Sequence, residues 1–125
     1  MKIRVYYEDT DTGGIVYHTN YIKYCERARS ELFFSNDMLP INGEKRGFVV
    51  KKIDANFIGS AVLGDILNIK SKLLKIRHAS AVLRQEVFKK EEKLFEMDIV
   101  LVYMEREKIT HIPETFESVL SMLRE

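Results

Sequence analysis

The stretch that decides the fold lies near the start of the chain and reads Tyr6-Tyr7-Glu8-Asp9-Thr10-Asp11-Thr12-Gly13-Gly14-Ile15-Val16-Tyr17-His18-Thr19-Asn20-Tyr21. Before it, Lys2–Glu8 is short, β-branched and aromatic, which predicts a strand. From residue 8 to residue 18 the chain holds Asp9, Asp11 and two adjacent glycines, a composition that predicts a loop. The loop therefore joins a strand to whatever element follows residue 18.

Helical spacing begins after this loop and continues to about Phe34, with Thr19 or Asn20 expected as the N-cap. The apolar face of the predicted helix consists of Tyr21, Tyr24, Cys25, Ala28 and Leu32. Charged side chains such as Lys23 and Glu31 fall on the opposite face. A helix with one apolar face packs that face against a partner element.

Four extended segments follow, at 49–57, 66–76, 79–88 and 94–104. The first places Val49, Ile53, Ala55 and Phe57 at alternating positions, and the last places Phe95, Met97, Ile99, Leu101 and Tyr103 on one side. Alternation of this kind predicts strands with one buried face. The charged run Lys89–Lys93 between the last two strands is interpreted as a hairpin tip with solvated charges.

A short helix is predicted at the end of the chain, where Pro113 precedes an apolar stripe of Phe116, Val119, Leu120 and Leu123. The whole pattern predicts an α+β domain over residues 1–125, with a five-stranded antiparallel sheet curled around the long helix. One helix and one sheet make a thin core with unpaired sheet edges. We therefore expect a homo-oligomer, a dimer or a tetramer, joined through a sheet edge.

The composition excludes several classes of protein. A formal net charge of +1 provides no field that would recruit nucleic acid, and no segment has the ~20 consecutive apolar residues of a membrane span. The single cysteine, Cys25, excludes an internal disulfide and fits a reducing compartment. Since the first residues also lack the apolar run of a signal peptide, we expect a cytoplasmic protein.

The loop at 8–18 has the parts that acyl transfer requires. The first backbone N–H groups of a helix are unpaired and lie at its positive dipole end, where they stabilise an oxyanion. A carboxylate a few residues upstream can act as a base or as a nucleophile, and glycines let the backbone approach a ligand closely. The alternative interpretation is an ordinary turn, for which Asp and Gly are common residues.

Metal and nucleotide sites are not supported by the same loop. Counted from Asp9, the spacing of a calcium-binding EF-hand loop fails at Gly13 and Asn20, where ligands are required. The glycines form neither a dinucleotide-binding fingerprint nor a phosphate-binding loop. We therefore expect no metal and no cofactor.

The residues from Val5 to His18, followed by Asn20-Tyr21 and Glu26-Arg27-Ala28-Arg29, resemble the start of the YbgC-type, tol–pal-associated acyl-CoA thioesterases. These enzymes belong to the 4-hydroxybenzoyl-CoA thioesterase branch of the hotdog-fold superfamily. The resemblance is dense over the first 30 residues or so and continues weakly through Phe48-Val49-Val50 and Gly64-Asp65. It implies the hotdog fold and hydrolysis of acyl-CoA, or of acyl groups on acyl carrier protein.

The resemblance also assigns roles to three residues. Asp11 falls on the catalytic carboxylate of the family, and the residue whose backbone N–H binds the thioester carbonyl falls on His18. Tyr7 matches the tyrosine that precedes the acidic motif and is expected to shape the site. Whether Asp11 activates water or attacks the carbonyl itself stays open, as does any role of the His18 side chain.

Two rival functions remain. A hotdog dehydratase acting on a 3-hydroxyacyl thioester needs a positioned histidine–carboxylate pair and gains little from this motif. A noncatalytic acyl-binding or scaffolding subunit near the cell envelope keeps the fold without needing an ionisable Asp11.

Other reactive side chains have simpler interpretations. Cys25 lies on the apolar face of the helix and is expected to be a packed thiol. Glu26 and Glu31 are alternative carboxylates because another hotdog branch uses one on its helix, although Arg27 and Glu31, four residues apart, are more simply interpreted as an ion pair. His78 and His111 are interpreted as surface or structural residues. The basic strand residues Lys51, Lys52, Lys70, Lys72, Lys75 and Arg77 include candidates for contacts to coenzyme A phosphates, although alternation alone makes them solvent-facing.

Overall fold

The elements of the computed structural model follow the predicted order, and the structure describes residues 1–124. Strand β1 (Lys2–Arg4) leads through the short 3-10 helix η1 (Tyr7–Asp9) to the long helix α1 (His18–Phe34). The remaining elements are β2 (Arg46–Phe57), β3 (Ile66–Ile76), β4 (Ser80–Lys89), β5 (Glu92–Glu105), β6 (Lys108–Ile109) and α2 (Glu114–Ser121).

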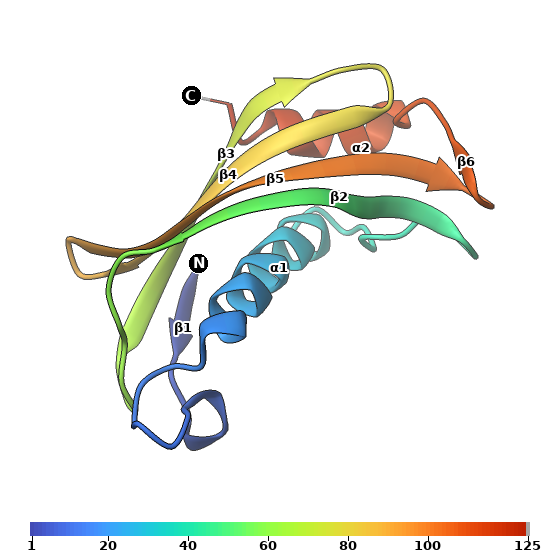
Figure 1. Cartoon of the computed structure of the whole chain (residues 1–125). Helices are drawn as coiled ribbons and strands as arrows, with labels where there is room; N and C mark the ends of the chain where they lie inside the picture. The colour runs from blue at the N-terminus through green and yellow to red at the C-terminus, as the bar shows by residue number, and fades with distance from the viewer. Residues whose placement is uncertain (125) are drawn as a thin grey trace.

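The sheet is antiparallel and has the strand order β1-β3-β4-β5-β2, with β6 paired to β5. It curls around α1, and α2 lies beside the far end of that helix (Figure 1). This arrangement confirms the predicted hotdog fold with its short C-terminal helix. The strand β6 was not predicted because two residues are too short to show alternation.

The inner face of the sheet and one face of α1 form the core. The predicted inward residues of β5, from Phe95 to Tyr103, are all buried, as are Tyr21, Tyr24 and Cys25 of α1. At the far end of α1, Phe116 of α2 packs against Phe33, with ring centroids 5.3 Å apart, and against Tyr103 at 5.9 Å. This aromatic cluster closes the C-terminal end of the helix against the sheet.

One predicted face is wrong in β2. The register shifts between Val50 and Lys52, where a β-bulge adds a residue opposite β5. Because a one-residue shift reverses the faces, Val50 opposite Leu101 points inward, and Val49 opposite Val102 does not share the face of Ile53.

The predicted first strand and the predicted helix cap are also corrected. The strand ends at Arg4 because the chain turns into η1, where the N–H groups of Asp9 and Thr10 donate to the carbonyls of Tyr6 and Tyr7. The N-cap of α1 is Tyr17, so Thr19 and Asn20 lie inside its first turn. The Asn20 side chain donates instead to the Asp9 carbonyl, at 2.9 Å.

The charges of the β4–β5 hairpin are more structured than predicted. The turn itself is Lys90-Glu91, but Lys93 pairs with Glu86 at 2.6 Å, and Lys89 pairs with Asp65 at 3.1 Å. The hairpin tip was correctly placed, and the partly exposed Lys89 and Lys93 add surface ion pairs that the sequence analysis did not predict.

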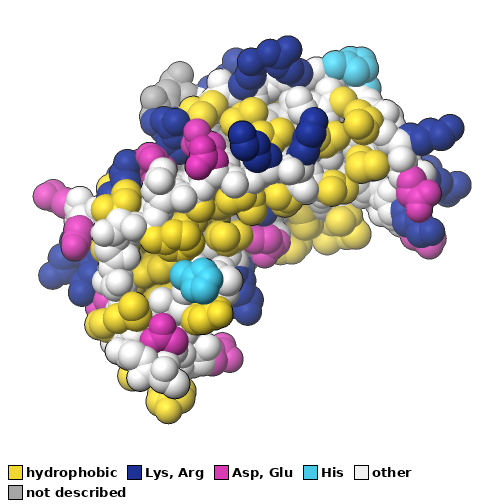
Figure 2. Space-filling model, viewed as in Figure 1, with side chains coloured by type: hydrophobic (Ala, Val, Ile, Leu, Met, Phe, Trp, Pro, Cys, Tyr) yellow, Lys and Arg dark blue, Asp and Glu magenta, His cyan; other side chains and the backbone are white. Residues whose placement is uncertain are grey.

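Strand β2 is an edge of the sheet, because its ladder pairs it only with β5 in the described part of the chain. Several of its side chains are large, apolar and exposed, among them Val50 and Phe57. Figure 2 shows apolar side chains gathered along the hollowed face where the sheet curls over α1. Within residues 1–124, no helix combines the length and the apolar character that crossing a membrane requires.

Candidate active site

The loop between η1 and α1 is folded by its own backbone. The Asp11 N–H donates to the Ile15 carbonyl at 2.9 Å, and the Gly14 N–H donates back to the Asp11 carbonyl at 3.0 Å. Gly14 has a φ of 83°, a left-handed conformation that side-chain-bearing residues rarely adopt. The loop is thus a small closed turn that presents Asp11 at its base.

The two aspartates of the motif have different surroundings. Asp9 is buried, and its Oδ2 accepts the Tyr6 N–H at 2.9 Å, while its carbonyl accepts the Tyr17 N–H and the Asn20 amide. These bonds tie η1 to the first turn of α1. Asp9 is therefore an anchor of the loop, a role that the sequence analysis did not assign.

One oxygen of the Asp11 carboxylate is hydrogen-bonded within the loop, and the other is free. Its Oδ1 accepts the Gly13 N–H at 2.8 Å, and its Oδ2 has no hydrogen-bond partner among the described residues. Asp11 lies in an open hollow of about 710 Å³. The hollow is lined by Tyr7, Thr10, Asp11, Thr12, Gly14, Tyr17 and Leu63.

The start of α1 supplies unpaired donors beside this hollow. The backbone N–H groups of His18 and Thr19 have no acceptor within residues 1–124. They lie at the positive end of a helix 17 residues long. Tyr17, which lines the hollow, directly precedes them in the chain.

The structure brings only two of the three predicted site side chains into the hollow. Tyr7 lines it with Asp11 and is 82% exposed. The His18 ring lies against Tyr17, with centroids 4.6 Å apart, and against the edge of Phe57 at 5.9 Å. His18 is not among the residues that line the hollow.

A second loop, between β2 and β3, supports the first. Ile15 forms a bridge with Val62, and the Val16 N–H donates to the Ala61 carbonyl at 2.9 Å. The Ala61 N–H in turn donates to the Tyr21 hydroxyl at 3.0 Å, and burial raises the pKa of that phenol. The helix, the acidic loop and the second loop are thereby joined into one unit.

The alternative reactive residues lie elsewhere. Cys25 is fully buried, and burial raises the pKa of its thiol to about 12, which opposes formation of a nucleophilic thiolate. Glu26 accepts the Ser30 hydroxyl at 2.6 Å, and neither Glu26 nor Glu31 lines the Asp11 hollow. The prediction of Cys25 as a packed thiol is confirmed.

Two buried polar residues were missed. Gln85 is fully buried on the inner face of β4, and a signal existed, because its position continues the inward alternation of Ala81 and Leu83. The hydroxyl of Tyr24 is buried without a hydrogen bond of good geometry among the described residues, and burial and then the Asp9 charge raise its pKa. No sequence signal separates Tyr24 from an ordinary core tyrosine.

Comparisons with known proteins agree with this geometry. A sequence model of the thioesterase superfamily matches residues 13–96. The acyl-CoA thioesterase YbgC of Helicobacter pylori strain J99 is 42% identical, over 97% of this chain and 98% of its own length. A probable thioesterase from Bartonella henselae has a solved structure that superposes with a TM-score of 0.83 at 29% identity, covering 90% of this chain and 97% of its own.

A hypothetical protein from Aquifex aeolicus shares the fold with a TM-score of 0.90 at 23% identity, over 96% of this chain and 97% of its own. The extent of these matches covers nearly every element described above. The chain therefore belongs to the thioesterase superfamily, among the relatives of YbgC.

Proposed function

We propose that this protein hydrolyses acyl thioesters of coenzyme A to the free acid and the thiol, with Asp11 as the catalytic carboxylate. The observation that carries the proposal is the free Oδ2 of Asp11 in a hollow that adjoins the unpaired N–H groups at the start of α1. The relatives at about 40% identity that are named acyl-CoA thioesterases support the same reaction.

The helix N-terminus would polarise the thioester carbonyl. Its oxygen would accept the N–H groups of His18 and Thr19, which also stabilise the oxyanion that forms on attack. Because these donors belong to the backbone, the His18 ring is not required for them. We expect His18→Ala to keep activity within roughly tenfold of wild type, below the range of a lost general acid or base.

Two routes are open to Asp11. As a base, it takes a proton from water while the water oxygen attacks the carbonyl carbon, and the C–S bond breaks to release the thiolate. As a nucleophile, Oδ2 attacks the carbon, the thiolate leaves, and water hydrolyses the mixed anhydride. In a single turnover in ¹⁸O-water, label found on Asp11 by mass spectrometry identifies the nucleophile route, because water has then attacked the Asp11 carbonyl of the anhydride. Attack at the acyl carbonyl places the label in the acid, as the base route does, so trapping of the anhydride with hydroxylamine is the second measurement.

Tyr7 would shape the entrance of the hollow and contact the substrate with its exposed ring. The acyl group of acyl carrier protein is a second substrate in this proposal, because the reacting thioester is the same. The single free thiol, Cys25, fits a cytoplasmic location.

A second copy of the chain would complete the assembly. The unpaired edge of β2 and its exposed apolar residues favour pairing with the same strand of another subunit, which places sites at the interface. Sedimentation of the purified protein distinguishes a dimer from a tetramer. A monomer at micromolar concentration contradicts this part of the proposal.

The test of the reaction is thiol release from a panel of acyl-CoAs by wild type and Asp11→Asn. We expect wild type to turn over and the folded mutant to lose at least ~10²-fold, the scale of a catalytic carboxylate. Equal activity in both proteins contradicts the role of Asp11. No release from any substrate by wild type favours the noncatalytic acyl-binding or scaffolding subunit instead.

A further inference from the structure

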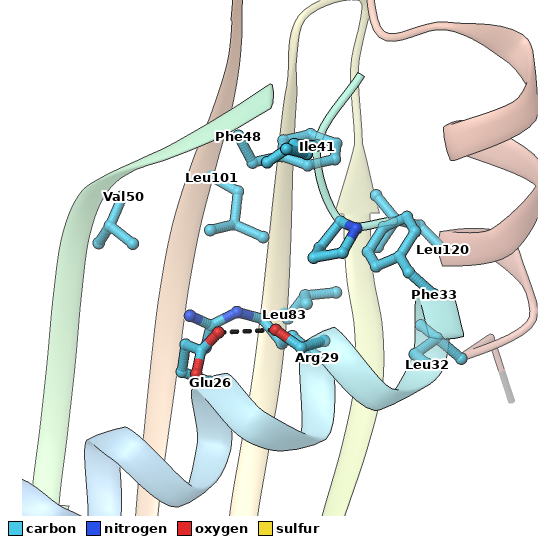
Figure 3. Close-up of a pocket in the computed structure, with 12 residues that line it drawn as sticks. Glu26, Arg29, Leu32, Phe33, Ile41, Phe48, Val50, Leu83, Leu101 and Leu120 are labelled. Atoms are coloured by element: carbon cyan, nitrogen blue, oxygen red, sulfur yellow. Dashed lines mark hydrogen bonds between the residues drawn. The ribbon is translucent and has the colours of Figure 1, made fainter. Parts of the chain in front are cut away.

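A second cavity lies at the other end of α1, enclosed by that helix, the inner face of the sheet and α2. Its volume is about 300 Å³, and it shares no lining residue with the Asp11 hollow. In Figure 3 Val50, Leu101 and Phe48 lie above it, Phe33 and Leu120 close one side, and Glu26 and Arg29 project from α1 below. The walls are apolar, and the three polar lining residues, Glu26, Arg29 and Ser30, all come from α1.

Arg29 is the unusual member of this lining. It is mostly buried, and burial lowers the pKa of its guanidinium. One N–H donates to Oε1 of Gln85 at 2.8 Å, and this is its only hydrogen bond among the described residues. A guanidinium carries five N–H donors, so most of the hydrogen-bonding capacity of Arg29 is unused.

Gln85 fixes that guanidinium without neutralising it. The fully buried amide donates to the Cys25 carbonyl and to the Ser71 hydroxyl, both at 2.9 Å, so both of its N–H donors are used while its Oε1 accepts from Arg29. No carboxylate lies within 4.0 Å of Arg29 in the part of the chain that the structure describes. Burying a cation without an opposite charge beside it costs free energy. A bound anion that pairs with the guanidinium would remove this cost.

Glu26 does not supply that anion. Its carboxylate accepts the Ser30 hydroxyl at 2.6 Å and belongs to an exposed side chain. Its charge raises the pKa of Arg29, but by less than burial lowers it, and it forms no ion pair with the guanidinium. Arg29 is mostly withdrawn from water and is screened less. The polar end of the cavity therefore favours a negative group on the ligand.

We propose that this cavity binds a free fatty carboxylate, with its carboxylate on Arg29 and its tail between Leu101, Phe33 and Leu120. A bidentate carboxylate uses two of the unused donors. At roughly 30 Å³ for each non-hydrogen atom, the share of a water molecule in the liquid, 300 Å³ holds about ten such atoms, as in an eight-carbon acid. The ligand is separate from the acyl group at Asp11, and the proposal does not depend on thioester hydrolysis.

The test compares octanoate with octan-1-ol, which has nearly the same shape but no charge, by titration calorimetry. We expect wild type to bind octanoate roughly tenfold or more tightly than the alcohol, the scale of hydrogen bonds to a charged group. Arg29→Gln should remove this difference. Lys23→Gln, an equal charge change on an exposed position of the same helix, should retain it.

A second variant tests the cavity independently, so that the proposal can be judged even if Arg29→Gln does not fold. Ile41→Phe narrows the cavity at an exposed lining position and should weaken binding of both ligands by a similar factor. Absence of saturable octanoate binding to wild type overturns the proposal, as does unchanged octanoate binding in Ile41→Phe.

The comparison of octanoate with octan-1-ol is repeated in Asp11→Asn with octanoyl-CoA present. Independent octanoate binding there supports a separate site even if no thioester is hydrolysed, and displacement contradicts it.

Discussion

The two ends of α1 differ in what they offer. At the N-terminal end, the unpaired backbone N–H groups follow Tyr17, which lines an open hollow together with the partly exposed Asp11, and the buried Asp9 anchors the loop. At the C-terminal end, aromatic rings from α1, β2 and α2 interlock around an apolar cavity. In the proposed reaction, chemistry depends on backbone geometry at one end of α1, whereas packing at the other end stabilises the fold. Mutations should therefore separate the two properties.

The largest effect is expected from Phe116→Ala at the packed end. Phe116 is buried against Phe33, Phe48 and Tyr103, and removing such a ring costs about 3–5 kcal/mol of unfolding free energy. Urea denaturation measures the loss. Thiol release per folded molecule should change less than about threefold, since no reacting group moves. A large fall in kcat at full folding would mean that the two ends are coupled.

The next effect is expected from Asp9→Ala at the reactive end, compared with Asp11→Ala. Loss of the Asp9 carboxylate leaves the Tyr6 N–H without its acceptor in a partly buried place, at a cost of about 1–3 kcal/mol in unfolding free energy. Asp11→Ala removes only an exposed bond to Gly13 and should cost less than about 1 kcal/mol. Equal destabilisation by the two substitutions would contradict the division between the anchor Asp9 and the weakly held carboxylate of Asp11.

A smaller effect is expected from Gly13→Ala. A Cβ at this position would lie 3.1 Å from the Asp11 Oδ1, so the carboxylate has to move by a few tenths of an ångström. We expect kcat/KM for acyl-CoA to fall by roughly tenfold, because small displacements of a reacting group are costly, with little change in stability. Gly47→Ala is the control, since its added Cβ meets only ordinary contacts at 3.7 Å.

The smallest effect concerns Asp65, which lies in the β2–β3 loop that supports the N-terminal end of α1. Its pKa is lowered, first by the hydrogen bond from the Val62 N–H and then by Lys89. A lowered pKa means that the stabilisation is present above the ordinary carboxyl range and is lost as the pH falls through the folded-state pKa. The unfolding free energy of wild type, measured by urea denaturation, should exceed that of Asp65→Asn by less than about 1 kcal/mol at pH 6, and the two values should converge near pH 2. A difference independent of pH would contradict this assignment.

Sequence patterns predicted the elements well where burial is periodic. The inward residues of β5 and the apolar face of α1 follow the spacing of strand and helix, so their positions could be assigned directly. The bulge at Val50 could not, because a single inserted residue leaves the local composition unchanged and reverses only the faces. For the same reason, the sequence did not predict that Val50 points inward and lines the second cavity.

The site was predicted less completely. Asp11 stood out because of its glycines and its resemblance to a family, whereas the local pattern gave Asp9 the same weight. The two differ through long-range burial and through bonds to Tyr17 and Asn20, which only the folded chain provides. The pairing of Arg29 with Gln85 joins residues 56 positions apart, and no periodicity reports such a contact.

The strand order has a consequence for the timing of synthesis. Strand β2 ends at Phe57, yet its ladder partner β5 begins only at Glu92, so the first half of the chain leaves the ribosome before its sheet partner exists. Until then the reactive loop and α1 have no complete sheet to cover them, and β2 exposes apolar residues on an open edge. Pairing of the β2 edge therefore waits until β5 has been made, and a delay in synthesis between these two strands prolongs the exposure of that edge.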